Sequence, residues 1–383
     1  MMKLKIFLNN MESKNQLIIN FMDDLKYWVA FSYLSEIGSV RFKKMLDYFK
    51  DLKLAWEADA GEFKKVGFEE KIIEKIILKR KKINPDEKME KVNNEKIGVI
   101  TFNDLRYPKL LKEIDNFPAL LFYKGDFQKH DEFSLAVVGT RKMSLYGKQI
   151  ILKIVKDLAQ NNLVIVSGLA KGVDALVHQV TLESNGRTIA VLGSGLDKKS
   201  IYPFENQNLA QKIVEQNGLL LSEYPPETFP QKYFFPYRNR IVAGLTLGTL
   251  VIEAPEKSGA LITARYALEC GREIFAVPGN IHNLNFSGCN NLIKMGGKLV
   301  DSADDILDAL NFVRTVKPVV KKIVKPSNKE ESELLKYLSE EPIHVDKLIE
   351  FSKLSPTIIN SVLTMMEING KIKHLGGMYY ILA

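Results

Sequence analysis

The segment 235–245 places side chains that could contact a nucleic acid directly before an apolar run. Its sequence is FPYRNRIVAGL, in which Arg238, Asn239 and Arg240 follow Phe235. Arginine binds phosphate through a planar, bidentate guanidinium, and an aromatic ring can stack on an unpaired base. The alternative interpretation is the start of a helix with solvated polar residues, so the segment alone does not decide the chemistry.

Small residues and cations recur where short apolar runs end. The loops are Gly139-Thr140-Arg141 after SLAVV, Ser167-Gly168-Leu169-Ala170-Lys171-Gly172 after LVIV, Gly193-Ser194-Gly195 after TIAVL, Pro278-Gly279-Asn280 after EIFAV, and Ser258-Gly259 just past TLVIEA. Glycine lets backbone N–H groups approach an anion, and a helix N-terminus favours negative charge. A single loop of this kind is best interpreted as a simple turn. Five such loops, with Arg141 and Lys171 among them, predict a phosphate-binding groove.

The motifs of nucleotide-dependent enzymes are absent from these loops. Gly139 is not followed by the remaining glycines of a dinucleotide fingerprint, and Gly193-x-Gly195 continues to Lys198 instead of glycine. The chain has no P-loop motif either. The sequence therefore disfavours an NAD-dependent enzyme and an ATPase.

Candidate catalytic groups are few. Asp174 and His178 are four residues apart on a predicted helix, where a structural ion pair or hydrogen bond is expected. Glu253 ends an apolar run and could act as a general base, although a carboxylate that orients Arg238 or Arg240 is the favoured interpretation. The five histidines have no metal-ligand spacing, and two cysteines provide neither a disulfide framework nor a thiolate metal site.

The charge of the chain favours an anionic partner. The net charge is +8, and six of the ten arginines lie between Arg141 and Arg272, in the segment that carries the loops. Lysine, asparagine and isoleucine enrichment can also reflect an AT-rich genome, so the placement of arginine is the more informative signal. No apolar run reaches the roughly 18 residues of a membrane helix. We expect a cytoplasmic protein in a reducing compartment.

The elements that must position these residues predict an α/β protein. Residues 96–312 alternate short apolar strands with amphipathic helices, which is typical of a Rossmann-like, doubly wound parallel sheet. Because ligands bind such sheets at the carboxyl ends of the strands, all five loops are expected at one edge.

Smaller regions flank the predicted sheet. We expect an N-terminal tail over 1–20, a small helical domain of the sterile-alpha or helix-hairpin-helix type over 21–95, a linker over 313–327 and a winged helix over 328–383. The helical domain is interpreted as a packing module. The predicted recognition helix, SPTIINSVLTMMEING, has no Arg or Lys, so a protein contact is at least as plausible for it as a DNA groove.

Long, ordered motifs in this chain resemble the DprA (Smf) family of DNA-processing proteins. They are YPKLLKEIDNFPALLFYKGDF, VVGTRKMSLYG, VSGLAKGVDALVH, VLGSGLD with YPFEN, LLSEYPPETFP, FPYRNRIVAGL, TLVIEAPEKSGALITARYALECGREIFAVPGNI and GCNNLIKMGGKLV. The resemblance covers about 100–310. Thr140 and Cys289 stand where serine and threonine, respectively, are common in the family, and neither departure removes a charge.

The resemblance implies a homodimer that binds single-stranded DNA, protects incoming strands and loads the RecA recombinase in natural transformation. It implies no catalysis, no cofactor and no membrane association. Residue by residue, Arg141 and Lys171 become phosphate ligands, and Ser167 and Gly168 an amide nest beside them. Gly139, which precedes Arg141 in its loop, is also expected to bind the nucleic acid. The strip that meets a base and its phosphates consists of Phe235, Arg238, Asn239 and Arg240, and Ser258 and Gly259 complete the pocket.

Two other functions stay open at this point. A nucleotide phosphoribohydrolase could use an arginine and a glutamate in the same glycine-lined pocket, although the PGGxGT-type loop of those enzymes is absent. A duplex-DNA binder could act through the winged helix, and it would lose most of its affinity without the residues after about 325.

Overall fold

The structure is a computed structural model that describes residues 25–312, 326–339 and 343–382. The chain divides into two compact units, Met1–Thr315 and Val316–Ala383. Each unit has its own hydrophobic core. The predicted tail, and nearly all of the predicted linker, lie outside the described residues. No helix in the described part of the chain is long and apolar enough to cross a membrane.

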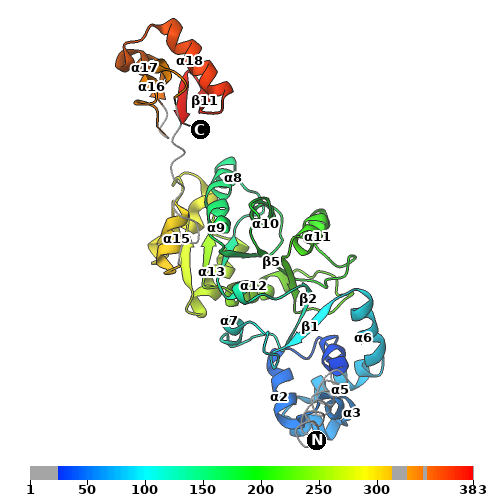
Figure 1. Ribbon diagram of the computed structural model, residues 1–383. Helices are drawn as coiled ribbons and strands as arrows, with labels where there is room; N and C mark the ends of the chain where they lie inside the picture. The colour runs from blue at the N-terminus through cyan, green and yellow to red at the C-terminus, as the bar shows by residue number, and fades with distance from the viewer. Residues whose placement is uncertain (1–24, 313–325, 340–342, 383) are drawn as a thin grey trace, which may run out of the picture. The chain divides into compact units, whose positions relative to one another are not determined.

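Short helices begin the first unit. After the helical residues 25–32 come α2 (Ser39–Phe49), α3 (Leu52–Glu57), α4 (Ala60–Lys65), α5 (Glu70–Arg80) and α6 (Pro85–Asn94). Side-chain caps begin three of them: Asp51 accepts from the amides of α3, Asp59 from α4 and Asn84 from α6. The helices share a continuous core with the sheet, because Trp28 and Phe42 belong to the same buried cluster as Phe122 and Leu192. Figure 1 shows them gathered beside β1 and β2.

The central sheet has nine strands. They are β1 (Gly98–Thr101), β2 (Leu120–Gly125), β3 (Ser134–Val138), β4 (Val164–Ser167), β5 (Thr188–Leu192), β6 (Leu219–Ser222), β7 (Gly248–Val251), β8 (Glu273–Ala276) and β9 (Lys298–Leu299), in the order β1-β2-β6-β5-β4-β3-β7-β8-β9. The seven strands from β6 to β9 in this order are parallel, as predicted, and their central members are fully buried. The antiparallel edge formed by β1 and β2 was not predicted from the sequence.

Helices connect the parallel strands on both faces of the sheet. The connections are α8 (Leu145–Ile150), which continues through a π-helical turn (Ile151–Val155) into α9 (Lys156–Gln160), then α10 (Val173–Glu183), α11 (Gln207–Glu215), α12 (Phe234–Gly244), α13 (Gly259–Glu269) and α14 (Ser287–Lys294). Short helices α7 (Lys109–Lys112) and α15 (Ala303–Ala309) flank this series. Because crossovers are right-handed, the helices between β3 and β6 cover one face and those between β6 and β9 cover the other.

The strand order reverses at the centre of the sheet. Strand β3 pairs with both β4 and β7, and the chain runs from β4 toward one edge and from β7 toward the other. Such a switch point leaves a crevice at the carboxyl ends of the two central strands. Arg141 follows β3 and Glu253 follows β7, so both lie at this crevice.

The second unit is a winged helix, as predicted. It contains α16 (Lys329–Leu334), α17 (Val345–Ser352) and α18 (Pro356–Ile368), with a small sheet of β10 (Ile343–His344), β12 (Tyr379–Leu382) and β11 (Ile372–Gly376). Its core includes Leu334, Leu348, Ile359 and Leu363, all fully buried.

Candidate nucleic-acid interface

The loops after β3 and β4 are held against each other at the switch point. The backbone amide of Val173 donates to the carbonyl of Thr140 at 3.1 Å. Between them Gly172 has φ +79°, and a Cβ there would lie 2.5 Å from the Thr140 oxygen. Only glycine fits this conformation and this approach, so the sequence SGLAKG brings Lys171 to the loop that carries Arg141.

A small pocket forms where these loops meet the start of α12. Its volume is about 40 Å³, and its lining residues are Arg141, Gly168, Ala170, Lys171, Tyr202, Pro203, Phe235 and Arg238. Five of the residues predicted to bind DNA therefore line one pocket at the carboxyl edge of the sheet. The remaining six, which are Gly139, Ser167, Asn239, Arg240, Ser258 and Gly259, do not line it.

Arg141 and Phe235 form the exposed side of this pocket. The guanidinium carbon of Arg141 lies 5.8 Å from the centre of the Phe235 ring, within the range of a cation–π contact. The Phe235 ring is half-buried, and its centre lies 5.6 Å from that of the exposed Tyr202 ring. A flat, apolar surface and a positive charge are thus adjacent, which suits a base and its phosphate.

Lys171 is exposed and already has an acidic neighbour. Its Nζ lies 2.5 Å from Oε1 of Glu205, on the loop after β5. The hydrogen bond between them raises the pKa of Lys171 and lowers that of Glu205. Exposed pairs of this kind contribute little to stability, so a phosphate can compete with Glu205 for the ammonium group.

The amide nest predicted at Ser167 and Gly168 is occupied by the protein itself. Asp174 Oδ2 accepts hydrogen bonds from the amides of Gly168 at 3.1 Å and Ala170 at 3.4 Å. The Ser167 hydroxyl is buried and donates to the carbonyl of Val137. Ser167 and Gly168 therefore shape the loop. The Gly168 amide donates to the Asp174 carboxylate, and so it is not free to bind a phosphate.

Arg238 is buried beneath the pocket, with 4% of its surface exposed. Its Nη1 donates to the carbonyls of Gly168, at 2.7 Å, and Val191. Burial lowers its pKa to about 10, while the nearby Asp174 opposes that shift. The Arg238 guanidinium therefore lines the pocket from beneath and not from its open side, and its contact with DNA stays a prediction. Phe235 and Arg238, three residues apart, both lie on α12.

Arg240 lies elsewhere, which corrects its predicted place in the same strip. Its Nη2 is 2.7 Å from both carboxylate oxygens of Glu223, and its Nε donates to the Asn116 carbonyl. Its guanidinium also lies 3.8 Å from the centre of the Tyr237 ring. Residues two positions apart on a helix do not face the same side, so Arg238 and Arg240 diverge.

The other predicted residues have structural contacts near the pocket. Asn239 Nδ2 donates to the Gly259 carbonyl at 3.3 Å, and Ser258 accepts from the Ala260 amide as the N-cap of α13. At Gly139, a Cβ would lie 2.6 Å from a methyl carbon of Val173, so a larger residue would push the two loops apart. Their roles toward DNA stay predictions.

Glu253 is fully buried, and its partners differ from those expected. Its carboxylate accepts from the backbone and hydroxyl of Ser144 and from the amide of Asn285, at 2.8–3.0 Å. Neither Arg238 nor Arg240 is among these partners. Glu253 thus fastens the segment after Arg141 to the loop before α14.

Asp174 and His178 do not pair with each other in the described contacts. Asp174 binds loop amides, whereas His178 Nδ1 lies 2.7 Å from the hydroxyl of Thr188. Burial raises the pKa of Asp174 and lowers the pKa of His178 to about 3. Both residues are therefore part of the core beneath the pocket.

The sequence analysis included Gly193-Ser194-Gly195 at the start of the loop after β5 but assigned no role to the later residues of that loop. Tyr202 and Pro203 line the pocket, Glu205 pairs with Lys171, and Phe204 is 74% exposed. Asn206 donates to the carbonyls of Leu169 and Ala170 and so fixes this loop against the other. The signal available in the sequence was YPFEN, which is one of the motifs that carry the family resemblance.

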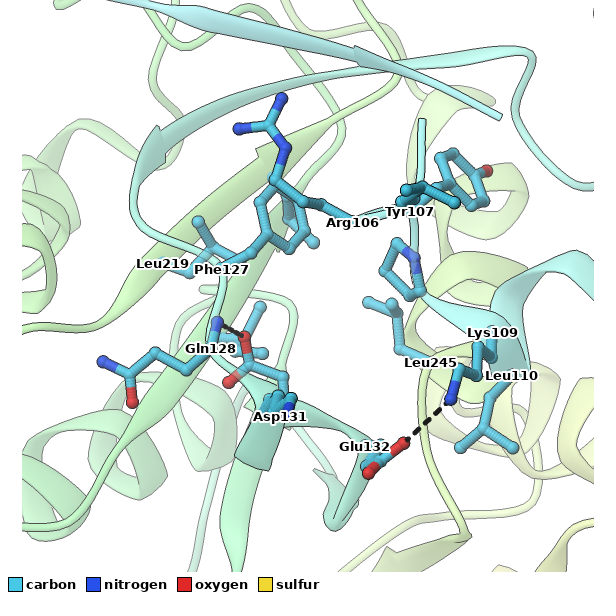
Figure 2. Close-up of a pocket in the computed structure, with 15 residues that line it drawn as sticks. Arg106, Tyr107, Lys109, Leu110, Phe127, Gln128, Asp131, Glu132, Leu219 and Leu245 are labelled. Carbon is cyan, nitrogen blue, oxygen red and sulfur yellow. Dashed lines mark hydrogen bonds and ion pairs between the residues drawn. The ribbon is translucent and has the colours of Figure 1, made fainter. Parts of the chain in front are cut away.

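A larger cavity, of about 650 Å³, lies at the opposite edge of the sheet. Ile189, Leu219 and Leu245, from the amino ends of strands or just before them, form part of its lining. Figure 2 shows its rim, where Gln128 donates to Asp131 and Lys109 lies 3.9 Å from Glu132. Because open parallel sheets bind ligands at the carboxyl ends of their strands, this cavity is the weaker candidate. In the described part of the chain, no group of three His, Cys, Asp or Glu side chains could hold a metal ion.

Two family models match the chain. The model for DNA recombination-mediator protein A matches residues 98–311, and that for the DprA winged helix domain matches residues 323–378. The first contains every loop that lines the pocket.

Known relatives are similar over long segments. Protein Smf of Synechocystis sp. is 35% identical over 391 residues, which cover 92% of this chain and 98% of that protein. The DNA processing protein DprA of Bacillus subtilis is 45% identical over 215 residues, 56% of this chain and 71% of that protein.

Two solved structures share the fold. DNA processing protein A from Streptococcus pneumoniae has a TM-score of 0.64 at 36% identity, covering 74% of this chain and 97% of that one. DNA processing protein A from Helicobacter pylori, described for its single-stranded DNA binding mode, has a TM-score of 0.50 at 32% identity. That match covers 56% of this chain and 95% of that one.

Proposed function

This chain belongs to the family of DNA recombination-mediator protein A, also called DprA or Smf, and from that premise we propose that it binds single-stranded DNA at the pocket of Arg141, Lys171 and Phe235. In this proposal, a DNA-processing protein holds strands taken up during natural transformation. It protects them and passes them to the RecA recombinase.

The observation that carries the proposal is the convergence of two exposed cations and a half-buried aromatic ring at the switch point of the sheet. A single strand presents a charged backbone and unstacked bases side by side, and duplex DNA does not. Stacking on an aromatic ring contributes about 1–3 kcal/mol per base and tolerates any sequence. The single-stranded DNA binding described for the Helicobacter pylori relative supports the same function.

The buried residues contribute by holding the exposed ones in place. Arg238 and Asp174 fix the loop that carries Lys171, and Glu253 fixes the segment that follows Arg141. A site whose supporting contacts are already formed has less conformational entropy to lose when a strand binds. Asn239, Ser258 and Gly259 form the neighbouring edge of the proposed groove.

We infer a binding protein, not an enzyme. Glu253 is fully buried with its oxygens engaged, and Asp174 and His178 are buried beneath the pocket, where the Thr188 hydroxyl beside His178 is fully buried too. A cytoplasmic homodimer completes the proposal, in agreement with the residues that resemble the family.

Fluorescence anisotropy of labelled single- and double-stranded oligonucleotides over a salt series tests the proposal. We expect single strands to bind more tightly, with log affinity falling by roughly 0.7 per phosphate contact for each unit of log salt. Arg141→Ala should weaken binding and make this slope shallower. Arg265→Ala is the matched control, because Arg265 is an exposed arginine on α13 outside the pocket.

Equal binding of duplex and single strands, with Arg141→Ala indifferent, would contradict the proposal. Release of ribose 5-phosphate from a panel of nucleotides would then favour the phosphoribohydrolase alternative.

A further inference from the structure

A second hollow lies on the other side of the aromatic cluster that begins α12. Its volume is about 420 Å³, within the range of about 300–1,000 Å³ typical of small-molecule sites. It lies between the N-terminal helices and the loop after β6, and both belong to the first unit. We call it the aromatic hollow; its lining residues include Tyr33, Phe42, Tyr224, Tyr233, Phe234 and Tyr237.

The aromatic hollow and the DNA pocket differ in the charge of the residues that line them. Arg141 and Lys171 line the DNA pocket, whereas the one charged residue among those lining the hollow is Glu223. Both Glu223 oxygens lie 2.7 Å from Arg240, which neutralises them. A hollow without a lining cation does not attract phosphate, but its rings offer faces for a flat, uncharged group.

Neighbouring residues connect the two sites. Phe235 faces Arg141 and Tyr202, while Phe234 stacks on Tyr224 with ring centres 4.1 Å apart. Tyr233 packs edge-on against Phe234 and remains 68% exposed, and Tyr237 is 40% exposed. A chain that crosses the start of α12 therefore meets a charged site first and then the exposed rings of Tyr233 and Tyr237, and the Arg240 guanidinium covers one face of the Tyr237 ring.

We propose that the aromatic hollow binds an unpaired base of the same DNA strand whose backbone is held at Arg141 and Lys171. This inference rests on the proposed function and extends it: the strand runs from the sheet edge over α12 toward the N-terminal helices. The helical region thereby forms one wall of a DNA site. Because ring stacking makes the contact, the hollow accepts any base.

Strand length separates the two sites. Labelled oligothymidylates of about 6 and about 20 nucleotides lie near the lower end and above the upper end of the about 4–16 nucleotide sites found in single-strand binding folds. Arg141→Ala should weaken both. Tyr233→Ala and Tyr237→Ala should each weaken the longer strand by about five- to tenfold and leave the shorter one unchanged. Tyr48→Ala is the control, since Tyr48 is exposed on α2 but does not line the hollow.

A strand carrying 2-aminopurine gives an independent signal, because this base loses fluorescence when it stacks on an aromatic ring. Quenching that Tyr233→Ala relieves supports the inference. Unchanged affinity of both tyrosine variants for the longer strand, or equal loss at both lengths, overturns it. If Arg141→Ala still weakens binding in that case, the proposed function stands and only the hollow is rejected; wild-type protein that binds neither strand rejects both.

Discussion

Asp174 and Arg238 hold the same residue, Gly168, by opposite ends. The carboxylate of Asp174 accepts from the Gly168 amide at 3.1 Å, and Arg238 Nη1 donates to the Gly168 carbonyl at 2.7 Å. A Cβ at Gly168 would lie 2.5 Å from the guanidinium, so only glycine permits this clamp. Two buried, oppositely charged groups thus set the conformation of the loop that ends in Lys171.

Arg238→Ala should destabilise the fold as well as weaken DNA binding. Loss of the guanidinium leaves the buried carbonyls of Gly168 and Val191 without this donor, and leaving a buried hydrogen-bonding group unsatisfied costs about 1–3 kcal/mol. The sequence alone favours the view that this variant binds less tightly without unfolding, and burial of the side chain alters that expectation. Urea unfolding combined with anisotropy measures both effects.

A double-mutant cycle with Asp174→Asn identifies the clamp. The two single changes should together cost clearly more than the double change, because either one alone already releases one end of Gly168. Additive losses in unfolding free energy would show that Asp174 and Arg238 act independently.

Glu205→Gln should strengthen binding of single strands. Glu205 lies 2.5 Å from the Lys171 ammonium and competes with phosphate for it. Both side chains are exposed, so the fold should keep its stability. We expect a severalfold gain in affinity at low salt, which fades as salt screens the competing charge.

The matched control for this prediction is Glu269→Gln, an exposed glutamate that pairs with Arg265 outside the pocket. A Glu205 variant that binds like this control would mean that Lys171 does not contact the strand.

How much of this site the sequence could predict depends on the range of the contacts involved. The strands from β3 to β8 were predictable because each is a short, mainly apolar run, and glycine and charge at their ends indicated the correct sheet edge. The sequence did not show that the side chains of Arg238 and Arg240 point in different directions, because that follows only once both residues are known to lie within α12. Arg240 also pairs with Glu223 on a different element, and a run of letters does not show such a partner.

Contacts formed in three dimensions explain the remaining differences. The sequence around Gly168 has the composition of an anion-binding nest, but the carboxylate of Asp174, from the following helix, accepts the Gly168 amide hydrogen bond. Tyr202 reaches the pocket through a loop that Asn206 fixes to the β4 loop, ten residues from the end of β5. Both features require the fold before their meaning is visible.

Acid should destabilise the first unit through His178. Burial lowers the pKa of His178 from 6.5 to about 3, so the folded state does not take up a proton that the unfolded chain accepts. The stability that neutral His178 contributes is fully present above pH 6.5, and it is lost progressively as the pH falls from 6.5 toward 3. The slope approaches about 1.4 kcal/mol per pH unit within this window.

Chemical unfolding at a series of pH values checks this sign. His178→Gln should remove that part of the slope between pH 6 and 4, while other groups, Asp174 included, contribute equally to both proteins. Parallel stability curves for wild type and variant would contradict the assignment.

Removal of the residues after about 325 should leave most single-strand affinity intact. The winged helix has its own core, so its loss should not unfold the first unit. Helix α18 (Pro356–Ile368) contains no Arg or Lys, and its exposed residues include Ile358, Met365 and Ile368. Its exposed polar residues include Asn360, Ser361 and Thr364, but the helix offers no cation for the phosphate contacts that dominate DNA affinity. Anisotropy with single and double strands should therefore show a modest loss for both, whereas the loss of most duplex affinity would assign DNA binding to the winged helix and leave the sheet edge with a different ligand.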